Sequence, residues 1–185
     1  MRMREAGMAE KRMEPQEHYW KKMNGQQLAI YLETLRITSG MKPEMLAFVC
    51  IGTDRSTGDA LGPLVGSKLA ELGYPHVIGT LEAPCDASNI VARLQEIPQD
   101  CAVIAIDACL GLKLSVGMYQ VSNRPLAPGK SVGKVLPQVG DYTIAAIVNA
   151  DGPRQYSVLQ TTSLYHVLQM AAEVTKAIQH AFPLR

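Results

Sequence analysis

Residues 48–65 read FVCIGTDRSTGDALGPLV, and their character changes twice along this stretch. The apolar run that begins at Met45 continues without a polar break until Gly52, which is typical of a strand covered on both faces. A loop of small polar residues follows and carries Asp54 and Asp59. The apolar residues that come next recur at helical spacing. The stretch therefore predicts a buried strand, a loop with two carboxylates, and a helix.

A similar alternation continues toward the C-terminus. Strand-like apolar runs at residues 76–81 and 101–107 enclose a helical pattern at residues 86–98. The order strand, helix, strand, helix, strand is typical of a parallel, layered α/β sheet. A further strand at residues 116–122 follows after only eight residues, which are too few for the crossover that joins parallel strands. We therefore expect this strand to be antiparallel and the sheet to be mixed.

The remaining patterns complete one α/β domain, which we expect to cover residues 24–185. A helix is predicted at residues 25–37, a strand at residues 142–149 and a closing helix at residues 161–182. The side chains of the closing helix expected to face inward are Leu164, Val167, Leu168, Ala171 and Ile178. Residues 1–23 are polar and charged almost throughout, and predict a flexible N-terminal tail.

The composition argues against several classes of protein. The net charge is +1, with acidic and basic residues intermixed and few aromatic side chains, so we expect no nucleic-acid partner. No apolar run reaches the ~18 residues that span a bilayer, and the charged N-terminus lacks the apolar segment of a signal peptide. We therefore expect no membrane association and place the protein in the cytoplasm.

The four cysteines have no CxxC spacing and no histidine cluster beside them. This favours buried, reduced thiols over a disulfide or a zinc site. We expect no metal and no other cofactor.

Acidic side chains follow each of the three predicted parallel strands, at the edge where ligands bind in open α/β sheets. The three connections hold the candidate polar residues in chain order: Asp54, Arg55, Ser56, Thr57 and Asp59; then Glu82, Cys85 and Asp86; then Asp107 and Cys109. If the three strands are neighbours in the sheet, these groups converge on one crevice.

Asp59 and Asp107 are the predicted catalytic pair. Asp107 ends the most apolar strand, where partial desolvation raises the pKa of a carboxyl, and a second carboxylate nearby raises it further. Such a pair can share one proton, so that the ionised carboxylate activates water while the protonated one polarises a carbonyl. The structural alternatives are that Asp59 caps the following helix and that Asp107 accepts hydrogen bonds from loop amides.

Three other motifs are weaker. The segment PGKSVGK at residues 128–134 is similar to a phosphate-binding loop, but Arg124 stands where a Walker A motif needs glycine. Cys85 or Cys109 could act as a nucleophile only beside a base, and no histidine follows a predicted parallel strand. Arg55 is expected either to pair with a neighbouring aspartate, Asp54 or Asp59, or to hold a substrate carboxylate.

The segments FVCIGTDRSTGDALGPLVGSKL, GTLEAP, VIAIDACLG, PLAPGKSVGKVLPQVGD and TIAAIVN, taken in this order, resemble the YyaC family of sporulation proteins over residues 46–182. That family looks like a small relative of the germination protease of spore-forming bacteria, an atypical aspartic peptidase. The resemblance to the protease rests on DALGP, on the strand ending in IDA, and on a PGxxVG loop that contains Gly129 and Gly133. It implies catalytic roles for Asp59 and Asp107.

A more distant similarity is to the hydrogenase maturation endopeptidases, which share the strand, loop, acid and helix opening. It implies a three-layer α/β/α sandwich with a mixed, mostly parallel sheet. In those enzymes two acids and a histidine bind nickel, and the acids would correspond to Asp59 and Asp107. Pro137 lies where the histidine is expected, which counts against a histidine-completed metal site.

We therefore expect an aspartate-dependent peptidase that acts on a peptide or small protein during sporulation or germination, in the forespore or spore core. The expected substrate-binding residues are Asp54, Arg55, Ser56, Thr57, Gly58, Gly129 and Gly133. Two alternatives stay open: a non-catalytic protein that binds a peptide or partner in the same crevice, and a metal-dependent hydrolase in which Asp54 or Asp86 joins the pair. A homo-oligomer is compatible with either.

Overall fold

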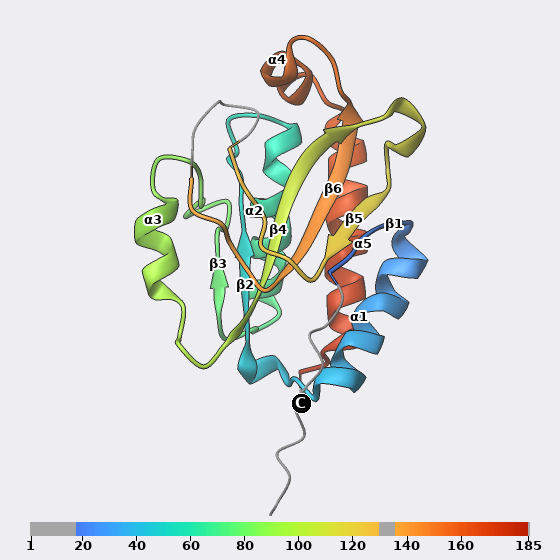
Figure 1. Cartoon of the computed structure of the whole chain (residues 1–185). Coiled ribbons are helices and arrows are strands. Elements are labelled where there is room, and N and C mark those ends of the chain that lie inside the picture. The colour runs from blue at the N-terminus through green and yellow to red at the C-terminus, as the bar shows by residue number, and fades with distance from the viewer. Residues whose placement is uncertain (1–17, 130–135, 185) are drawn as a thin grey trace, which may run out of the picture.

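A computed structural model describes residues 18–129 and 136–184 (Figure 1). Six strands form one sheet in the order β1-β5-β6-β4-β2-β3. The strands β2, β3, β4 and β6 are mutually parallel, whereas β5 is antiparallel to both β6 and β1. The strands are β1 (Trp20–Met23), β2 (Leu46–Cys50), β3 (Val77–Ile78), β4 (Ala102–Gly111), β5 (Tyr119–Ser122) and β6 (Tyr142–Ala150). The predicted antiparallel strand and the mixed sheet are therefore confirmed.

Three long helices cover one face of the sheet, behind the strands in Figure 1: α1 (Gly25–Ser39), α2 (Leu61–Glu71) and α5 (Leu164–Ala181). Helix α5 packs against both α1 and α2. The main hydrophobic core lies between these helices and the sheet, and every residue of β2 is buried. Continuous burial of this kind is expected for a central parallel strand, and explains why its sequence shows no polar alternation.

The opposite face has a thinner cover. The short helix α3 (Ile90–Arg93) lies over β2 and β3 with a smaller core, and the chain around the Leu126–Val139 bridge crosses in front of β4 (Figure 1). Helix α4 (Gln155–Gln160) lies at the end of the molecule where the parallel strands finish. The architecture is thus a three-layer α/β/α fold with a mixed sheet, as predicted.

Three predicted details were wrong. Residues 20–23, assigned to the N-terminal tail, form β1, because their backbone pairs with β5; residues 1–17 lie outside the described part of the chain. The helix expected at residues 86–98 is a single α-helical turn followed by a 3₁₀ turn. Leu164 and Leu168 are exposed on α5, since the helix turns Val167 and Met170 toward the core instead.

Close backbone packing fixes the connection from β2 to α2. Gly52 has a φ of 146°, and a side chain there would overlap the carbonyl oxygen of Asp59. A side chain at Gly62 would overlap the carbonyl oxygen of Ile51. The backbone on either side of Asp59 is therefore held directly against the end of β2. Within residues 18–129 and 136–184, no helix combines the length and the apolar character needed to cross a bilayer.

Candidate functional site

A cavity of about 350 Å³ lies beside the carboxyl end of β2 and the middle of β4. Its walls come from five parts of the chain: the end of β2 with the loop after it (residues 52–59, the first loop), the loop after β3 (residues 79–89, the second loop), the middle of β4, α4, and the chain at Pro128, Gly129 and Leu136. The charged lining residues are Arg55, Asp59, Asp86 and Asp107. The strands β2, β3 and β4 are neighbours in the sheet, and the expected convergence is found for these four residues. Three other candidates, Glu82, Cys85 and Cys109, do not line the cavity.

Asp59 reaches the cavity because the first loop folds back on itself. The amide of Thr53 donates to the carbonyl of Asp59 at 3.2 Å, and the amide of Ala60 donates to the carbonyl of Ser56 at 3.0 Å. Asp59 lies inside the 3₁₀ turn Gly58–Ala60, and neither this turn nor α2 begins with a side-chain capping bond. The capping alternative for Asp59 is therefore wrong, and its carboxyl faces the cavity.

Asp107 lies in the middle of β4, opposite Ala145 of β6, and not at the end of the strand as predicted. The prediction was wrong because pairing with β6 carries β4 on to Gly111. Its Oδ1 accepts a hydrogen bond of 2.8 Å from the amide of Ala108, the next residue. Burial raises the pKa of Asp107 from 3.8 to about 8; the Ala108 amide lowers it in part, and the charge of Asp59 raises it further. Near neutral pH this carboxyl is consequently protonated for much of the time.

Burial also raises the pKa of Asp59, although the nearby hydroxyl of Ser56 lowers it in part. The Ser56 Oγ has no hydrogen-bond partner among the described residues, so the Ser56 hydroxyl and the Asp59 carboxyl are not hydrogen-bonded in the structure. Both carboxyls of the acid pair, Asp59 and Asp107, thus have raised pKa values, and one acts on the other. Two such carboxyls titrate together: once one of them has lost its proton, the other holds its own proton more tightly.

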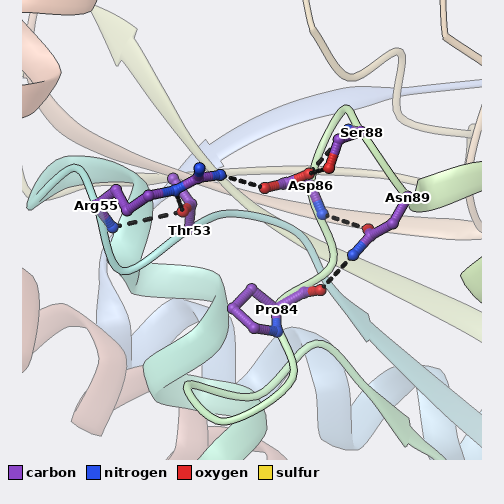
Figure 2. Close-up of polar contacts among 6 residues, drawn as sticks. All are labelled: Thr53, Arg55, Pro84, Asp86, Ser88 and Asn89. Atoms are coloured by element: carbon purple, nitrogen blue, oxygen red, sulfur yellow. Dashed lines mark hydrogen bonds and ion pairs between the residues drawn. The ribbon is translucent and has the colours of Figure 1, made fainter.

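Asp86 is the third carboxyl of the cavity, and its surroundings are different (Figure 2). Its Oδ2 accepts a hydrogen bond of 2.8 Å from the Arg55 Nη2, and its Oδ1 accepts from the amide and hydroxyl of Ser88. Burial acts to raise the pKa of Asp86, but the bonds from Ser88 and the guanidinium of Arg55 outweigh it, and the pKa is lowered. Asp86 is a fixed anion.

Arg55 therefore pairs with Asp86. The predicted pairing with Asp54 or Asp59, its neighbours in the sequence, was wrong. Its Nε also donates to the Thr53 hydroxyl at 3.1 Å, and Figure 2 shows the side chain reaching from the first loop to the second. The second loop is ordered by Asn89, whose side chain accepts from the Asp86 amide and donates to the Pro84 carbonyl. The ion pair thus joins two loops that are already folded.

The predicted substrate-binding residues are placed unevenly. Arg55 and Gly129 line the cavity together with the acid pair. Four others belong to the first loop without lining the cavity: Asp54, Ser56, Thr57 and Gly58. Gly133 lies outside the described residues.

The structure gives no support to a cysteine nucleophile. Burial raises the pKa of Cys85 to about 11 and that of Cys109 to about 12, so both thiols keep their protons near neutral pH. None of the four histidines lines the cavity. Among the residues that the structure describes, no three His, Cys, Asp or Glu side chains gather as a metal ion would require.

Sequence reasoning missed the apolar wall of the cavity. Tyr156 and Leu159 of α4 lie on one side, and Leu136 lies in the segment that precedes β6. Gly58 packs against Leu159, where a larger side chain would collide, and this contact holds α4 against the first loop. The position of α4 in the chain could have indicated this wall, because α4 follows the carboxyl end of β6, a fourth parallel strand that finishes at the same edge of the sheet.

The fold and the cavity define an α/β protein whose central feature is a half-buried pair of carboxyls. The chain belongs to the family described as protein of unknown function (DUF1256), whose model matches residues 17–177. It is 48% identical over 147 residues to the uncharacterized protein YyaC of Bacillus subtilis (strain 168), covering 77% of this chain and 70% of that protein. The resemblance to YyaC is thereby confirmed.

A comparison with solved structures finds a [NiFe] hydrogenase maturation protease, HycI from Thermococcus kodakarensis KOD1. The two chains are 18% identical with a TM-score of 0.47, over 80% of this chain and 99% of the other.

Proposed function

We propose that the protein is an aspartate-dependent peptidase in which Asp59 and Asp107 activate a water molecule. The observation that supports this most directly is that two carboxyls from separate elements line one cavity and that the charge of one raises the pKa of the other. Burial alone is common at structural sites, but two carboxyls with raised pKa values in one cavity are typical of acid–base catalysis.

The chemistry needs one ionised and one protonated carboxyl. The ionised group takes a proton from water as the water oxygen attacks the peptide carbonyl carbon, and the protonated group donates a hydrogen bond to the carbonyl oxygen. When the C–N bond breaks and the carbonyl re-forms, the leaving nitrogen takes up the proton that the base had accepted from water, and both carboxyls return to their starting states. A pair in which Asp107 has a pKa of about 8 supplies this combination over the neutral range.

The test is digestion of a mixed peptide library by the full-length protein at several pH values, with products identified by mass spectrometry. Wild type should cleave a subset of peptides, and both Asp59→Asn and Asp107→Asn should lose this cleavage. Asp100→Asn is the matched control, because Asp100 is an exposed aspartate outside the cavity and close to the amino end of β4. Equal cleavage by wild type and both site variants would refute the proposal.

A second candidate is a protein that binds a peptide in the same cavity without cleaving it. The apolar walls favour this alternative, since Ile51, Leu136 and Leu159 offer a surface that could hold a side chain whether or not hydrolysis follows. Retention of peptides by the wild-type protein, recovered intact after long incubation at every pH, would select binding over catalysis.

The place of action is a separate proposal. The motifs shared with the YyaC family support a role in sporulation or germination, in the cytoplasm of the forespore or the spore core. Deletion of the gene in the source organism, followed by counting of heat-resistant spores and measurement of germination, tests this role independently of the chemistry.

A further inference from the structure

The Ser56 hydroxyl is a buried polar group without a hydrogen-bond partner among residues 18–129 and 136–184. Only 3% of Ser56 is exposed, and its Oγ makes no hydrogen bond within the structure. A buried hydroxyl left without a bond destabilises a fold, so native proteins normally give it an acceptor. The residue therefore calls for an explanation beyond packing.

The nearest ionisable candidate for this hydroxyl is the carboxyl of Asp59. The backbone at Thr57 and Ala60 is helical, and the Ala60 amide bonds to the Ser56 carbonyl, so residues 56 and 59 are three positions apart on one helical turn. Side chains with this spacing are neighbours on a helix surface. The hydroxyl already lowers the pKa of Asp59 in part.

We infer that Ser56 is a positioning residue whose hydroxyl donates a hydrogen bond to the ionised carboxylate of Asp59, so that Asp59 is the water-activating base and Asp107 the proton donor. This assignment rests on the proposed peptidase function, which by itself leaves the two roles open. When Asp59 is protonated the bond is weaker, because charged acceptors form the stronger hydrogen bonds.

The other charged groups of the cavity do not remove this difference between Asp59 and Asp107. The ionisable residues that share the cavity with Asp59 are Arg55 of its own loop, Asp86 of the second loop, Asp107 of β4 and Tyr156 of α4. Arg55 is committed to Asp86, so its charge is largely balanced. Within the described residues, Asp107 accepts a hydrogen bond from the amide of Ala108 alone, and burial keeps its pKa at about 8.

The test is a carboxyl titration by NMR of the full-length protein labelled with ¹³C at aspartate Cγ, without any substrate. In wild type Asp59 should lose its proton at lower pH than Asp107. Ser56→Ala should raise the lower pKa of the acid pair by about one unit, which is the size expected for one hydrogen bond to a charged group. Ser56→Thr should keep the wild-type value, because it retains the hydroxyl.

Ser115→Ala is the matched control, since Ser115 is also buried but bonds to Lys22 away from the cavity. It should leave both titrations unchanged. The inference is overturned if Asp107 ionises first in wild type, a result that needs no variant to fold, or if Ser56→Ala and Ser115→Ala titrate alike. A protein that cleaves no peptide yet titrates as expected would refute the peptidase proposal and leave the Ser56–Asp59 bond standing.

Discussion

The second loop and the middle of β4 each contribute a carboxyl to the same cavity, and the pKa values of the two carboxyls are shifted in opposite directions. Asp86 accepts bonds from Ser88 and from the guanidinium of Arg55, which lower its pKa. Asp107 accepts one bond from its neighbouring amide, and burial raises its pKa to about 8. Location in this cavity is therefore not enough to define a catalytic acid, because the balance between burial and hydrogen-bond donors sets the pKa of each carboxyl.

The largest expected difference is in catalysis. Replacement of a general acid or base typically costs 10²–10⁴-fold in rate, so Asp107→Asn should lower peptide cleavage by roughly this factor. Asp86→Asn should lower it by less than about tenfold, because Asp86 is already ionised and paired and does not take part in proton transfer. Initial rates on one cleaved peptide, with thermal unfolding to verify folding, measure both. Equal losses in the two variants would remove the distinction between them.

A second prediction concerns what holds Asp59 near Asp107. Gly52→Ala should destabilise the protein by about 3 kcal/mol or more, because the new methyl group overlaps the Asp59 carbonyl oxygen at a φ of 146°. Gly40→Ala, at the end of α1, also has a positive φ but has no atom within 4 Å of the new methyl group, so it should cost only about 1–2 kcal/mol. Urea unfolding compares the two. A smaller loss at position 52 would mean that the first loop can move away from β2.

The third prediction is a dependence of stability on pH. The raised pKa of Asp107 means that the folded state holds its proton between pH ~4 and ~8 while the unfolded chain has released it. Its contribution therefore lowers the free energy of unfolding as the pH rises through this range, by at most about 1.4 kcal/mol per pH unit.

Asp107→Asn should flatten this part of the curve, and urea unfolding at pH 5, 6, 7 and 8 measures the difference from wild type. The lowered pKa of Asp86 has the opposite effect: it stabilises the fold at pH values above the pKa of the unfolded chain, and this contribution is lost as the pH falls below about 4. Asp86→Asn should therefore lower the free energy of unfolding mainly above pH ~4. Parallel curves for wild type and Asp107→Asn would show that Asp107 titrates normally.

The smallest expected effect belongs to the ion pair between the loops. The Arg55 side chain is 75% exposed, and exposed pairs contribute about 0.2–1 kcal/mol. A double-mutant cycle with Arg55→Met and Asp86→Asn should give a coupling in this range that falls as salt is added. A coupling of several kcal/mol would mean that the pair, and not the backbone at Gly52, fixes the first loop.

Much of this arrangement can be predicted from the sequence, because buried parallel strands have continuous apolar sequences. The unbroken apolar runs of β2 and β4 predict central strands, and central strands place Asp59 and Asp107 at one edge. The partner of Arg55 could not be chosen in this way, since Asp54, Asp59 and Asp86 are equal in charge and only the fold of the second loop brings Asp86 within 2.8 Å.

The helices show the same limit. The pattern at residues 86–98 predicted a full helix. The Asp86 and Asn89 side chains instead form hydrogen bonds with nearby backbone and side-chain groups, and these bonds compete with helix formation. Val91, which was expected to face the core, is 60% exposed. On α5 the inward face follows from contact with α1 and α2, and it excludes Leu164 despite its apolar side chain. Local pattern identifies an element more securely than it identifies the face that the element buries.

The most direct test of the central claim, that Asp59 and Asp107 act on each other, is the ¹³C carboxyl titration of Asp107 in wild type and in Asp59→Asn. Wild-type Asp107 should titrate with a pKa of about 8, and the value should fall in the variant because the neighbouring charge is removed. A pKa near 4 in wild type, unchanged by Asp59→Asn, would contradict the account.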